Sequence, residues 1–318
     1  MDGQPVDHGV PMLHGRAAPF VEELLRFSTS GVTPIFDWPH HVRGAGTPCQ
    51  PQAYRALGVR LAVREGVTSF AKHLARQPGV EIERETKVER IAMEPGSFRL
   101  ETTRGERRAA TLILTSPVDQ MIELLDPLES GEELRGLVET LRTVYTLPCL
   151  TVIAGYREAP ALDFHLRLPG PPSPIHSLLH DSSKRAAGAI TTLVVQGQPA
   201  FSRKHLEDPD ESWTRELLAS CAALLGDWVT RPSWQQAHRW HHARVARGSE
   251  LSHPSLLGFP GGARLGLCGD AFHPAGGVEG AYLSGLELAT RVESGAATTV
   301  ARPAPDASGP ETHQSVRG

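Results

Sequence analysis

The stretch from Arg264 to Leu288 constrains this chain more than any other part of its sequence. It opens with the apolar run Leu265–Cys268, which stops abruptly at Gly269 and Asp270. A short apolar run that ends in a Gly-Asp pair predicts a buried strand whose carboxyl end opens into a loop. After Gly276-Gly277 the apolar residues recur at spacings of three and four, which predicts a helix.

The predicted helix carries mostly small residues on one face, so it can lie close to a sheet or a ligand. That face holds Val278, Ala281, Tyr282, Gly285, Leu286 and Ala289. The N–H groups and dipole at a helix start favour a phosphate or an electron-rich ring edge. The carboxylate of Asp270 can accept hydrogen bonds from sugar or sugar-alcohol hydroxyls. The alternative is an ordinary β–loop–α unit in which Asp270 serves as a cap.

The residues Gly269-Asp270, Gly277 to Ala281 and Ser284-Gly285 resemble the C-terminal flavin-binding motif of FAD-dependent amine-oxidase-like enzymes. Within that group the chain looks most like the renalase family and its bacterial relatives. The resemblance implies that Asp270 holds the ribityl chain and that the helix start faces the flavin pyrimidine ring and the pyrophosphate region. The cofactor-binding residues that it implies are Val88, Gly269, Asp270, Gly277, Val278 and Ala281.

Val88 is the implied contact that lies far from the motif in sequence. In the family, the backbone at this position meets the adenine of FAD. Thr86 to Ile91 also alternates apolar and polar residues, as a half-buried strand does. Val88 can therefore equally be a core strand residue, and the sequence does not separate the two roles.

The segment that should bind most of a dinucleotide is not found in the sequence. A strand–Gly-x-Gly-x-x-Gly–helix unit seats a pyrophosphate at a helix N-terminus. Gly44-Ala45-Gly46 is followed by Thr47-Pro48-Cys49, so the third glycine is missing and a proline stands where the helix should begin. We interpret it as a loop. Either the gene begins upstream and Met1 is internal, which we favour, or the chain is a truncated, non-catalytic relative that acts as a binding or interaction module.

The fold class expected is α/β plus α+β, with a partial FAD-binding Rossmann-like domain that lacks its N-terminal βαβ unit. The second part is a substrate domain with an antiparallel or mixed sheet, because its strands do not alternate with helices. The expected ranges are a partial FAD-binding domain at 1–116, a substrate domain at 117–240, a return to the FAD-binding domain at 241–293 and a disordered tail at 294–318. Helices are expected near 19–27, 66–74, 134–141 and 208–225, strands near 80–83 and 86–91, and a central strand near 109–115.

His238 and Trp240 are the candidates for contact with a flat aromatic substrate. Trp234, Gln236, His238 and Trp240 alternate along one predicted strand and share a face. Tryptophan offers a large apolar surface, and histidine exchanges a proton near neutrality. The alternative places Trp240 in a domain interface, with His238 as a hydrogen-bonded neighbour. His40-His41 and the group His238, His241 and His242 lack carboxylate or cysteine partners at metal-ligand spacing, so no metal is expected.

The composition of the chain limits the kinds of partner and the cellular location that can be expected. Among 318 residues the formal net charge is −4, which gives no electrostatic reason to expect a nucleic-acid partner. No apolar run approaches the roughly 20 residues that span a bilayer. The first ten residues have neither the basic start nor the apolar core of a signal peptide. The four cysteines are far apart and form no C-x-x-C pair, so they are expected to be free thiols in a reducing compartment or core residues, and a cytoplasmic location is expected.

The function that the resemblance implies is that of an FAD-dependent oxidase. A small substrate, a dihydronicotinamide isomer or an amine, would transfer a hydride to the flavin, and molecular oxygen would take up the electrons. The absence of a Ser/His/Asp or Cys/His signature agrees with chemistry carried by a cofactor. The sequence does not indicate an oligomeric state.

Overall fold

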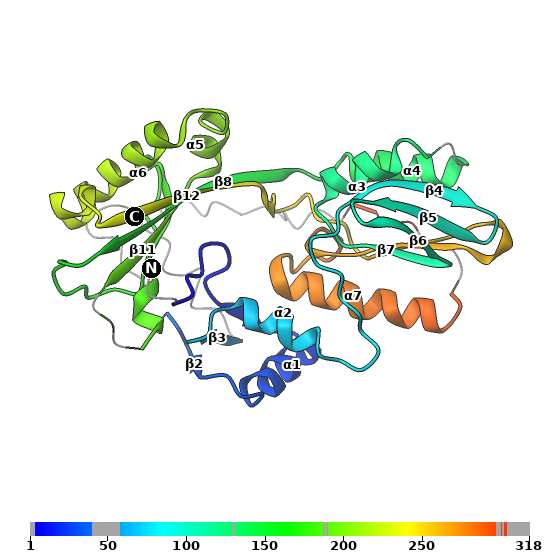
Figure 1. Cartoon of the computed structure of the whole chain (residues 1–318), viewed down its shortest axis with the longest axis horizontal. Helices are drawn as coiled ribbons and strands as arrows, with labels where there is room; N and C mark the ends of the chain where they lie inside the picture. The colour runs from blue at the N-terminus through cyan, green and yellow to red at the C-terminus, as the bar shows by residue number, and fades with distance from the viewer. Residues whose placement is uncertain are drawn as a thin grey trace, which may run out of the picture. The chain divides into compact units, whose positions relative to one another are not determined.

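The structure, a computed structural model, describes residues 4–39, 58–128, 131–186, 188, 190–296, 300 and 302–303. Its elements group into two compact units, and each unit combines two separate stretches of chain (Figure 1). Unit 1 comprises Met1–Arg84 and Leu147–Ala243. Unit 2 comprises Glu85–Thr146 and Arg244–Gly318.

Unit 1 is built on a five-stranded sheet of order β12-β8-β11-β10-β9. Its strands are β8 (Thr146–Tyr156), β9 (Leu166–Arg167), β10 (Ile175–His180), β11 (Thr191–Gly197) and β12 (Trp234–Val245). The β8–β11, β11–β10 and β10–β9 pairs are antiparallel. These pairings agree with the antiparallel or mixed sheet that the strand-rich composition predicts.

Alternation along β8 places Val152 and Ile153 on opposite faces of this sheet, and both are buried. On the Val152 face lies α6 (Asp210–Leu225), which contributes Trp213 and Leu217 to a shared core. The short helix α5 (Pro199–Lys204) precedes it. The predicted amphipathic helix and its closing glycine are confirmed, since α6 ends at Gly226 with φ 94°.

On the Ile153 face the N-terminal part of the chain packs through Met12 and Trp38. It forms a small antiparallel sheet of order β1-β3-β2, with β1 (Leu13–Gly15), β2 (Pro34–Phe36) and β3 (Val59–Val63). Helices α1 (Ala18–Ser28) and α2 (Thr68–Leu74) follow β1 and β3, where the sequence predicts them. They meet through the rings of Phe27 and Phe70, whose centroids are 5.2 Å apart.

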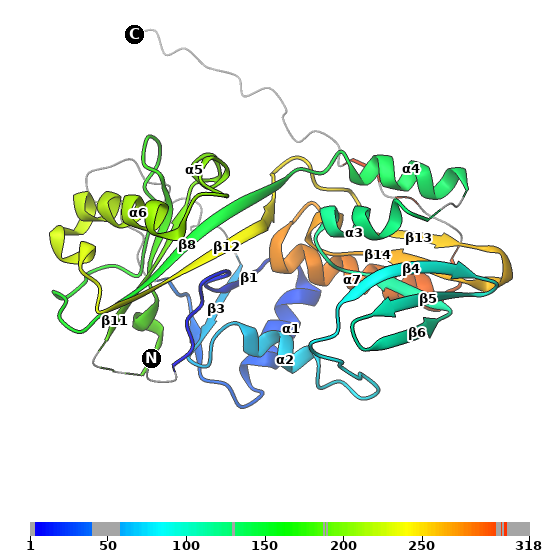
Figure 2. The same cartoon turned by 45° about the horizontal axis from the view of Figure 1, so that its top comes forward.

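Unit 2 contains two three-stranded sheets. The antiparallel sheet joins β4 (Val88–Glu94), β5 (Ser97–Thr102) and β6 (Gly105–Ala109), as Figure 2 shows. The second sheet has the order β13-β14-β7, from β7 (Thr111–Leu114), β13 (Ser255–Gly258) and β14 (Arg264–Leu267). β14 pairs parallel with β7 and antiparallel with β13.

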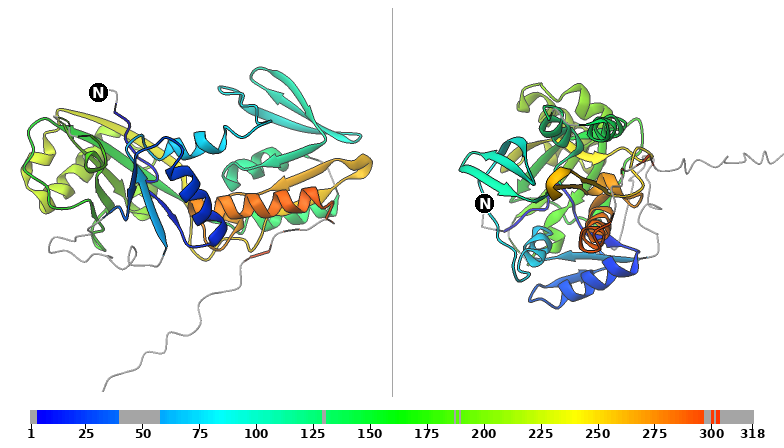
Figure 3. Two further views of the ribbon diagram at one scale, coloured as in Figure 1. Left: turned by 90° about the horizontal axis from the view of Figure 1, so that it is seen from below. Right: turned by 90° about the vertical axis from the view of Figure 1, so that its right-hand side faces the viewer.

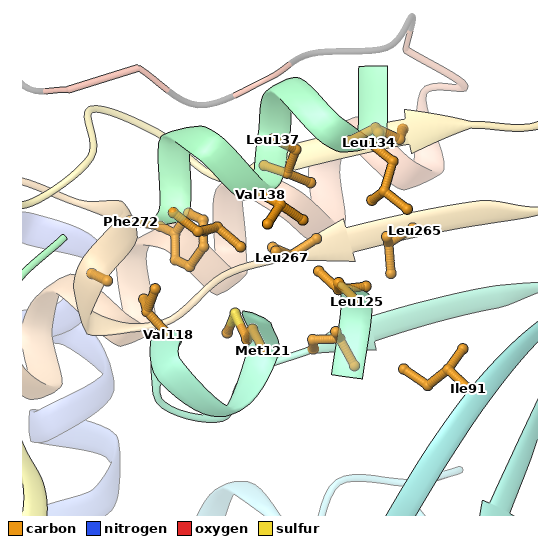
Figure 4. Close-up of a cluster of buried hydrophobic side chains, with 14 of the residues drawn as sticks. Ile91, Val118, Met121, Leu125, Leu134, Leu137, Val138, Leu265, Leu267 and Phe272 are labelled. Carbon is orange, nitrogen blue, oxygen red and sulfur yellow. The ribbon is translucent and has the colours of Figure 1, made fainter. Parts of the chain in front are cut away.

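Helices cover both faces of the β13-β14-β7 sheet, which explains why β14 is apolar from Leu265 onwards. One face packs against α3 (Val118–Leu125) and α4 (Glu132–Leu141). Figure 4 shows the side chains of this core, among them Val118, Met121, Leu125, Leu134, Leu137, Val138, Leu265 and Leu267. The other face packs against α7 (Gly277–Glu293), the orange helix beside the β13–β14 hairpin in Figure 3.

Gly266 lets α7 approach β14 closely. It lies between Leu265 and Leu267 in the strand and therefore faces the other way, towards α7. A Cβ at Gly266 would lie 2.9 Å from a methyl carbon of Leu288. A larger residue here would push the helix away from the strand.

Two expectations from the sequence are corrected. Residues 80–83 form no strand, and both Val80 and Ile82 are exposed. The strand near 109–115 is not central among the described residues, where β7 pairs only with β14. In the two compact units, residues 1–84 pack with 147–243, and the helices within 118–141 pack into the core of unit 2.

Candidate functional site

The turn after β14 is held against α7 by one buried serine. Gly269, with φ 145°, leads from the strand into a short 3-10 turn, η5 (Asp270–Phe272). The hydroxyl of Ser284 accepts a hydrogen bond from Gly269 N–H at 3.0 Å and lies 2.8 Å from Gly269 C=O. Ser284 is fully buried. Because both bonds involve one hydroxyl, the position of the Asp270 turn is fixed relative to the helix.

The start of α7 presents backbone donors. Gly276 and Gly277 have φ values of 59° and 55°, a region that L side chains rarely adopt. The first hydrogen bond within the helix runs from Gly280 N–H to Gly276 C=O at 2.8 Å. The N–H groups of Gly277 and Val278 therefore precede the helical ladder. Since no described side chain caps this helix start, these donors and the helix dipole favour an acceptor or anionic ligand.

The carboxyl group of Asp270, in the turn that packs against α7, lies in an environment that opposes its ionisation. Burial raises the pKa of its carboxyl group, and the nearby Glu250 raises that pKa further. Hydrogen bonds from the backbone N–H groups of Ala271 and Asp270 act in the opposite direction. Within the described residues Asp270 forms no ion pair. A half-buried carboxylate without a cation is an acceptor suited to ligand hydroxyl groups.

Five of the implied cofactor-binding residues are thus brought together by one turn and one helix start. Gly269 and Asp270 lie in the turn, and Gly277, Val278 and Ala281 lie in the first turns of α7. Val88 stands apart at the start of β4, half-buried and packed against the core of unit 2. Both of the roles left open for Val88 therefore remain open.

The face that α7 buries differs from the one expected. Gly280, Ser284 and Leu288 are buried, whereas Leu286 is 47% exposed and Ala289 is exposed. Ser284 turns inwards because its hydroxyl holds the Gly269 turn. The sequence motif includes Ser284 and Gly280, but their roles in packing could not be assigned without the structure.

The second candidate region lies in unit 1, on β12. His238 and Trp240 share one face of the strand, as the alternation predicts, with ring centroids 4.2 Å apart. A third ring joins them from the N-terminal segment, since His8 stacks on Trp240 with centroids 5.4 Å apart and planes inclined by 25°. No local pattern predicts these contacts of His8, because 230 or more residues separate it from its ring partners.

The segment that carries His8 is anchored by a buried ion network that sequence reasoning missed. Asp7 pairs with Lys184 at 2.6 Å and with Arg185 at 2.9 Å, and Asp181 pairs with both of these cations as well. The Lys184 side chain is completely buried. Asp181 and Lys184 bound the short 3-10 turn η2 that follows β10. The four charged side chains are buried and paired with one another, and they hold the N-terminal segment on the rest of unit 1.

Three remaining expectations concern other parts of the chain. The Gly44-Ala45-Gly46 loop and His40-His41 lie outside the described residues. Where the structure describes the chain, no group of three His, Cys, Asp or Glu side chains is placed to hold a metal ion. In the same residues, no helix is both long and apolar enough to cross a membrane.

Comparison with known structures identifies proteins of the same fold. A structure described as a protoporphyrinogen oxidase, from Exiguobacterium sp. 255-15, matches with a TM-score of 0.58 and 18% identity, over 74% of this chain and 52% of that protein. Putrescine oxidase bound to putrescine matches with a TM-score of 0.55 and 15% identity, over 75% and 54%. Cyclohexylamine oxidase from Brevibacterium oxydans matches with a TM-score of 0.54 and 13% identity, over 74% and 54%.

This chain therefore spans about half the length of the solved structures that it matches. At these identities the likeness shows the fold alone. The family assignment comes from the sequence, because residues 27–293 match the family of flavin-containing amine oxidoreductases. That match includes β14, the Asp270 turn and α7 as well as β12. The chain belongs to the flavin-containing amine oxidoreductase family.

Proposed function

We propose that this chain is an FAD-dependent oxidoreductase in which unit 2 holds the flavin. The observation that carries the proposal is the Asp270 turn next to the uncapped start of α7, locked together by Ser284. A flavin presents ribityl hydroxyls, which are donors, and a pyrimidine edge with oxygen and nitrogen acceptors. Asp270 suits the hydroxyls, and the N–H groups of Gly277 and Val278 suit the acceptor edge.

The residues at this site also fit the cofactor sterically. Among the described residues, no atom lies within 4 Å of the position that a Cβ would take at Gly277, and a Cβ at Gly276 would lie 3.6 Å from a carboxylate oxygen of Glu250. A flat ring can therefore approach the backbone at the helix start. FAD, when bound, supplies the hydride acceptor and the reactivity with oxygen, while the protein supplies position and electrostatics.

Unit 1 is the proposed substrate-binding part, and His238 and Trp240 are its proposed contacts. The half-buried rings on β12 offer an apolar, aromatic surface for a planar substrate. The resemblance to the renalase family favours a dihydronicotinamide isomer as that substrate. An amine is the competing class, supported by the family to which the chain belongs. Molecular oxygen is the proposed electron acceptor in both cases.

The experiment that tests this proposal is anaerobic mixing of the flavin-loaded protein with each substrate class, followed by the flavin absorbance. We expect isomeric dihydronicotinamides to bleach the flavin quickly and simple amines to bleach it slowly or not at all. Rapid bleaching by an aryl-alkyl amine alone would refute the substrate class and leave the flavoenzyme intact. If no donor of either class reduces the flavin, the oxidoreductase proposal fails, and the non-catalytic binding module becomes the better account.

A further inference from the structure

The His8 side chain lies against two rings of β12 in unit 1. Its ring stacks on Trp240 and meets the ring of His238 edge-on, with centroids 4.8 Å apart. Together the three rings form an aromatic wall, defined here as His8, His238 and Trp240. All three side chains are half-buried, so the wall is partly open to a ligand.

Backbone contacts on both sides of His8 fix its position. The Gln196 side-chain amide donates a hydrogen bond to the carbonyl of Gly9 at 2.8 Å. Asp7, the preceding residue, accepts a bond from Val67 N–H at 2.8 Å and belongs to the buried ion network. A Cβ at Gly9 would lie 3.2 Å from the Trp240 ring, so glycine permits this close approach.

The wall also contains two buried polar atoms that lack partners. His8 Nδ1 and Trp240 Nε1 form no hydrogen bond with any described residue. Burying a polar atom without a hydrogen-bond partner is unfavourable, so native proteins retain few such atoms. Because two such atoms lie on the stacked rings of the aromatic wall, we interpret the wall as a ligand-binding surface and not only as part of the core.

The electrostatics of the wall keep His8 uncharged near neutral pH. Burial lowers the pKa of His8, and the facing His238 lowers it further. The carboxylates of Asp7 and Asp181 act in the opposite direction, and both are already paired with Lys184 and Arg185. A neutral His8 adds no positive charge that would oppose a cation at the rings of the wall.

We propose that His8 is a specificity-determining residue, which completes with His238 and Trp240 a wall for the pyridinium ring of an oxidised nicotinamide. This inference rests on the proposed function, because loss of hydride from a dihydronicotinamide leaves a pyridinium cation. The cation is attracted to the face of Trp240, and a protonated His8 would repel it. Ligand binding at the wall therefore depends on the charge of His8.

The test uses the whole chain without flavin and 1-methylnicotinamide as the cationic probe. Tryptophan fluorescence is titrated at pH 7.5 and pH 5.5 in the wild type and in His8→Gln, and uncharged nicotinamide serves as the neutral probe. Trp240→Leu identifies the part of the signal that comes from the wall. His205→Gln is the matched control, because His205 also lies against an aromatic ring of unit 1, 4.6 Å from Phe201.

We expect the wild type to bind the cation more weakly at pH 5.5 than at pH 7.5, because protonation of His8 places a like charge a few ångströms from the ligand. Nicotinamide should show little of this pH dependence. His8→Gln should reduce the pH dependence for the cation, and His205→Gln should leave it unchanged. A role for His8 in folding alone would change stability but would not separate the two probes.

Two results would overturn the inference: no saturable binding of the cation by the wild type, or an unchanged pH dependence in His8→Gln. If His8→Gln does not fold, as circular dichroism would show, Gln196→Leu takes its place, since it keeps the imidazole and removes the hydrogen bond that holds the backbone beside it. The expected result is then weaker cation binding, and unaltered binding would also overturn the inference. Binding that depends on His8 in a protein whose flavin no donor reduces would refute the proposed function instead.

Discussion

Replacing Asp270 separates the flavin-binding role of this carboxylate from a structural one. In Asp270→Ala the acceptor for the ribityl hydroxyls is lost. A hydrogen bond to a charged group is worth about 1.5–3 kcal/mol, which corresponds to flavin binding that is about 10- to 150-fold weaker. Asp270→Asn keeps a neutral acceptor oxygen, so its affinity should fall between those of the wild type and the alanine variant.

Protein stability should change in the opposite direction from flavin affinity. Because the folded-state pKa of Asp270 is raised above its ordinary value of 3.8, the stabilising contribution is present below pH 3.8 and is lost as the pH rises through the raised pKa. At pH 7 the ionised carboxylate therefore destabilises the fold. Asp270→Asn should melt at a higher temperature than the wild type at pH 7, and the difference should shrink towards pH 4.

Riboflavin and FAD titrations measure the affinity, and thermal unfolding measures the stability. Riboflavin carries the ribityl chain without the pyrophosphate, so both ligands should lose the same factor in Asp270→Ala. Asp126→Asn is the control, because Asp126 forms an exposed ion pair with Arg142 in the same unit and should affect neither quantity measurably. Unchanged flavin affinity in Asp270→Ala would refute a flavin-binding role for Asp270. The alternative, in which Asp270 serves only as a cap, would then be favoured.

Three further predictions follow from the sequence and the contacts. Because the printed sequence carries no Gly-x-Gly-x-x-Gly turn, the purified chain should be nearly colourless, and a visible spectrum with stoichiometric FAD would contradict this. Ser284→Ala removes both contacts with Gly269 and should lower the free energy of unfolding by about 1–3 kcal/mol, as measured in a urea titration. An unaltered midpoint would show that Ser284 does not hold the Gly269 turn against the helix. Lys184→Met leaves Asp7 and Asp181 short of one cation and should destabilise unit 1 by about 3–5 kcal/mol; a more stable variant would show that the ion network is retained for another reason.

The sequence predicted the parts of the fold that local patterns control. The strand, turn and helix around Asp270 are confirmed because an apolar run, a Gly-Asp pair and a 3.6-residue period act within one stretch of chain. Local patterns also misled. Val80 and Ile82 alternate like strand residues, yet both are exposed, since no described strand pairs with them.

Features that join distant residues were out of reach. Asp7 and Lys184 are 177 residues apart, and nothing in either neighbourhood marks them as a buried pair. The same holds for His8 beside Trp240, and for the packing of residues 1–84 with 147–243. The small residues along α7 predicted one buried face, but the helix buries the face that carries Ser284, whose hydroxyl is hydrogen-bonded to Gly269. Such choices depend on tertiary contacts that periodicity does not encode.

The most direct test of flavin binding in unit 2 is amide hydrogen exchange with and without saturating FAD. We expect slower exchange in the peptides that cover Gly269–Asp270 and the first turn of α7, because their N–H groups would become bound or shielded. Peptides from α3 and α4, which already lie in the core of unit 2, should be unaffected and provide the internal reference. Saturable FAD binding that leaves exchange at the start of α7 unchanged, and slows it elsewhere, would contradict the assignment of the flavin to this site.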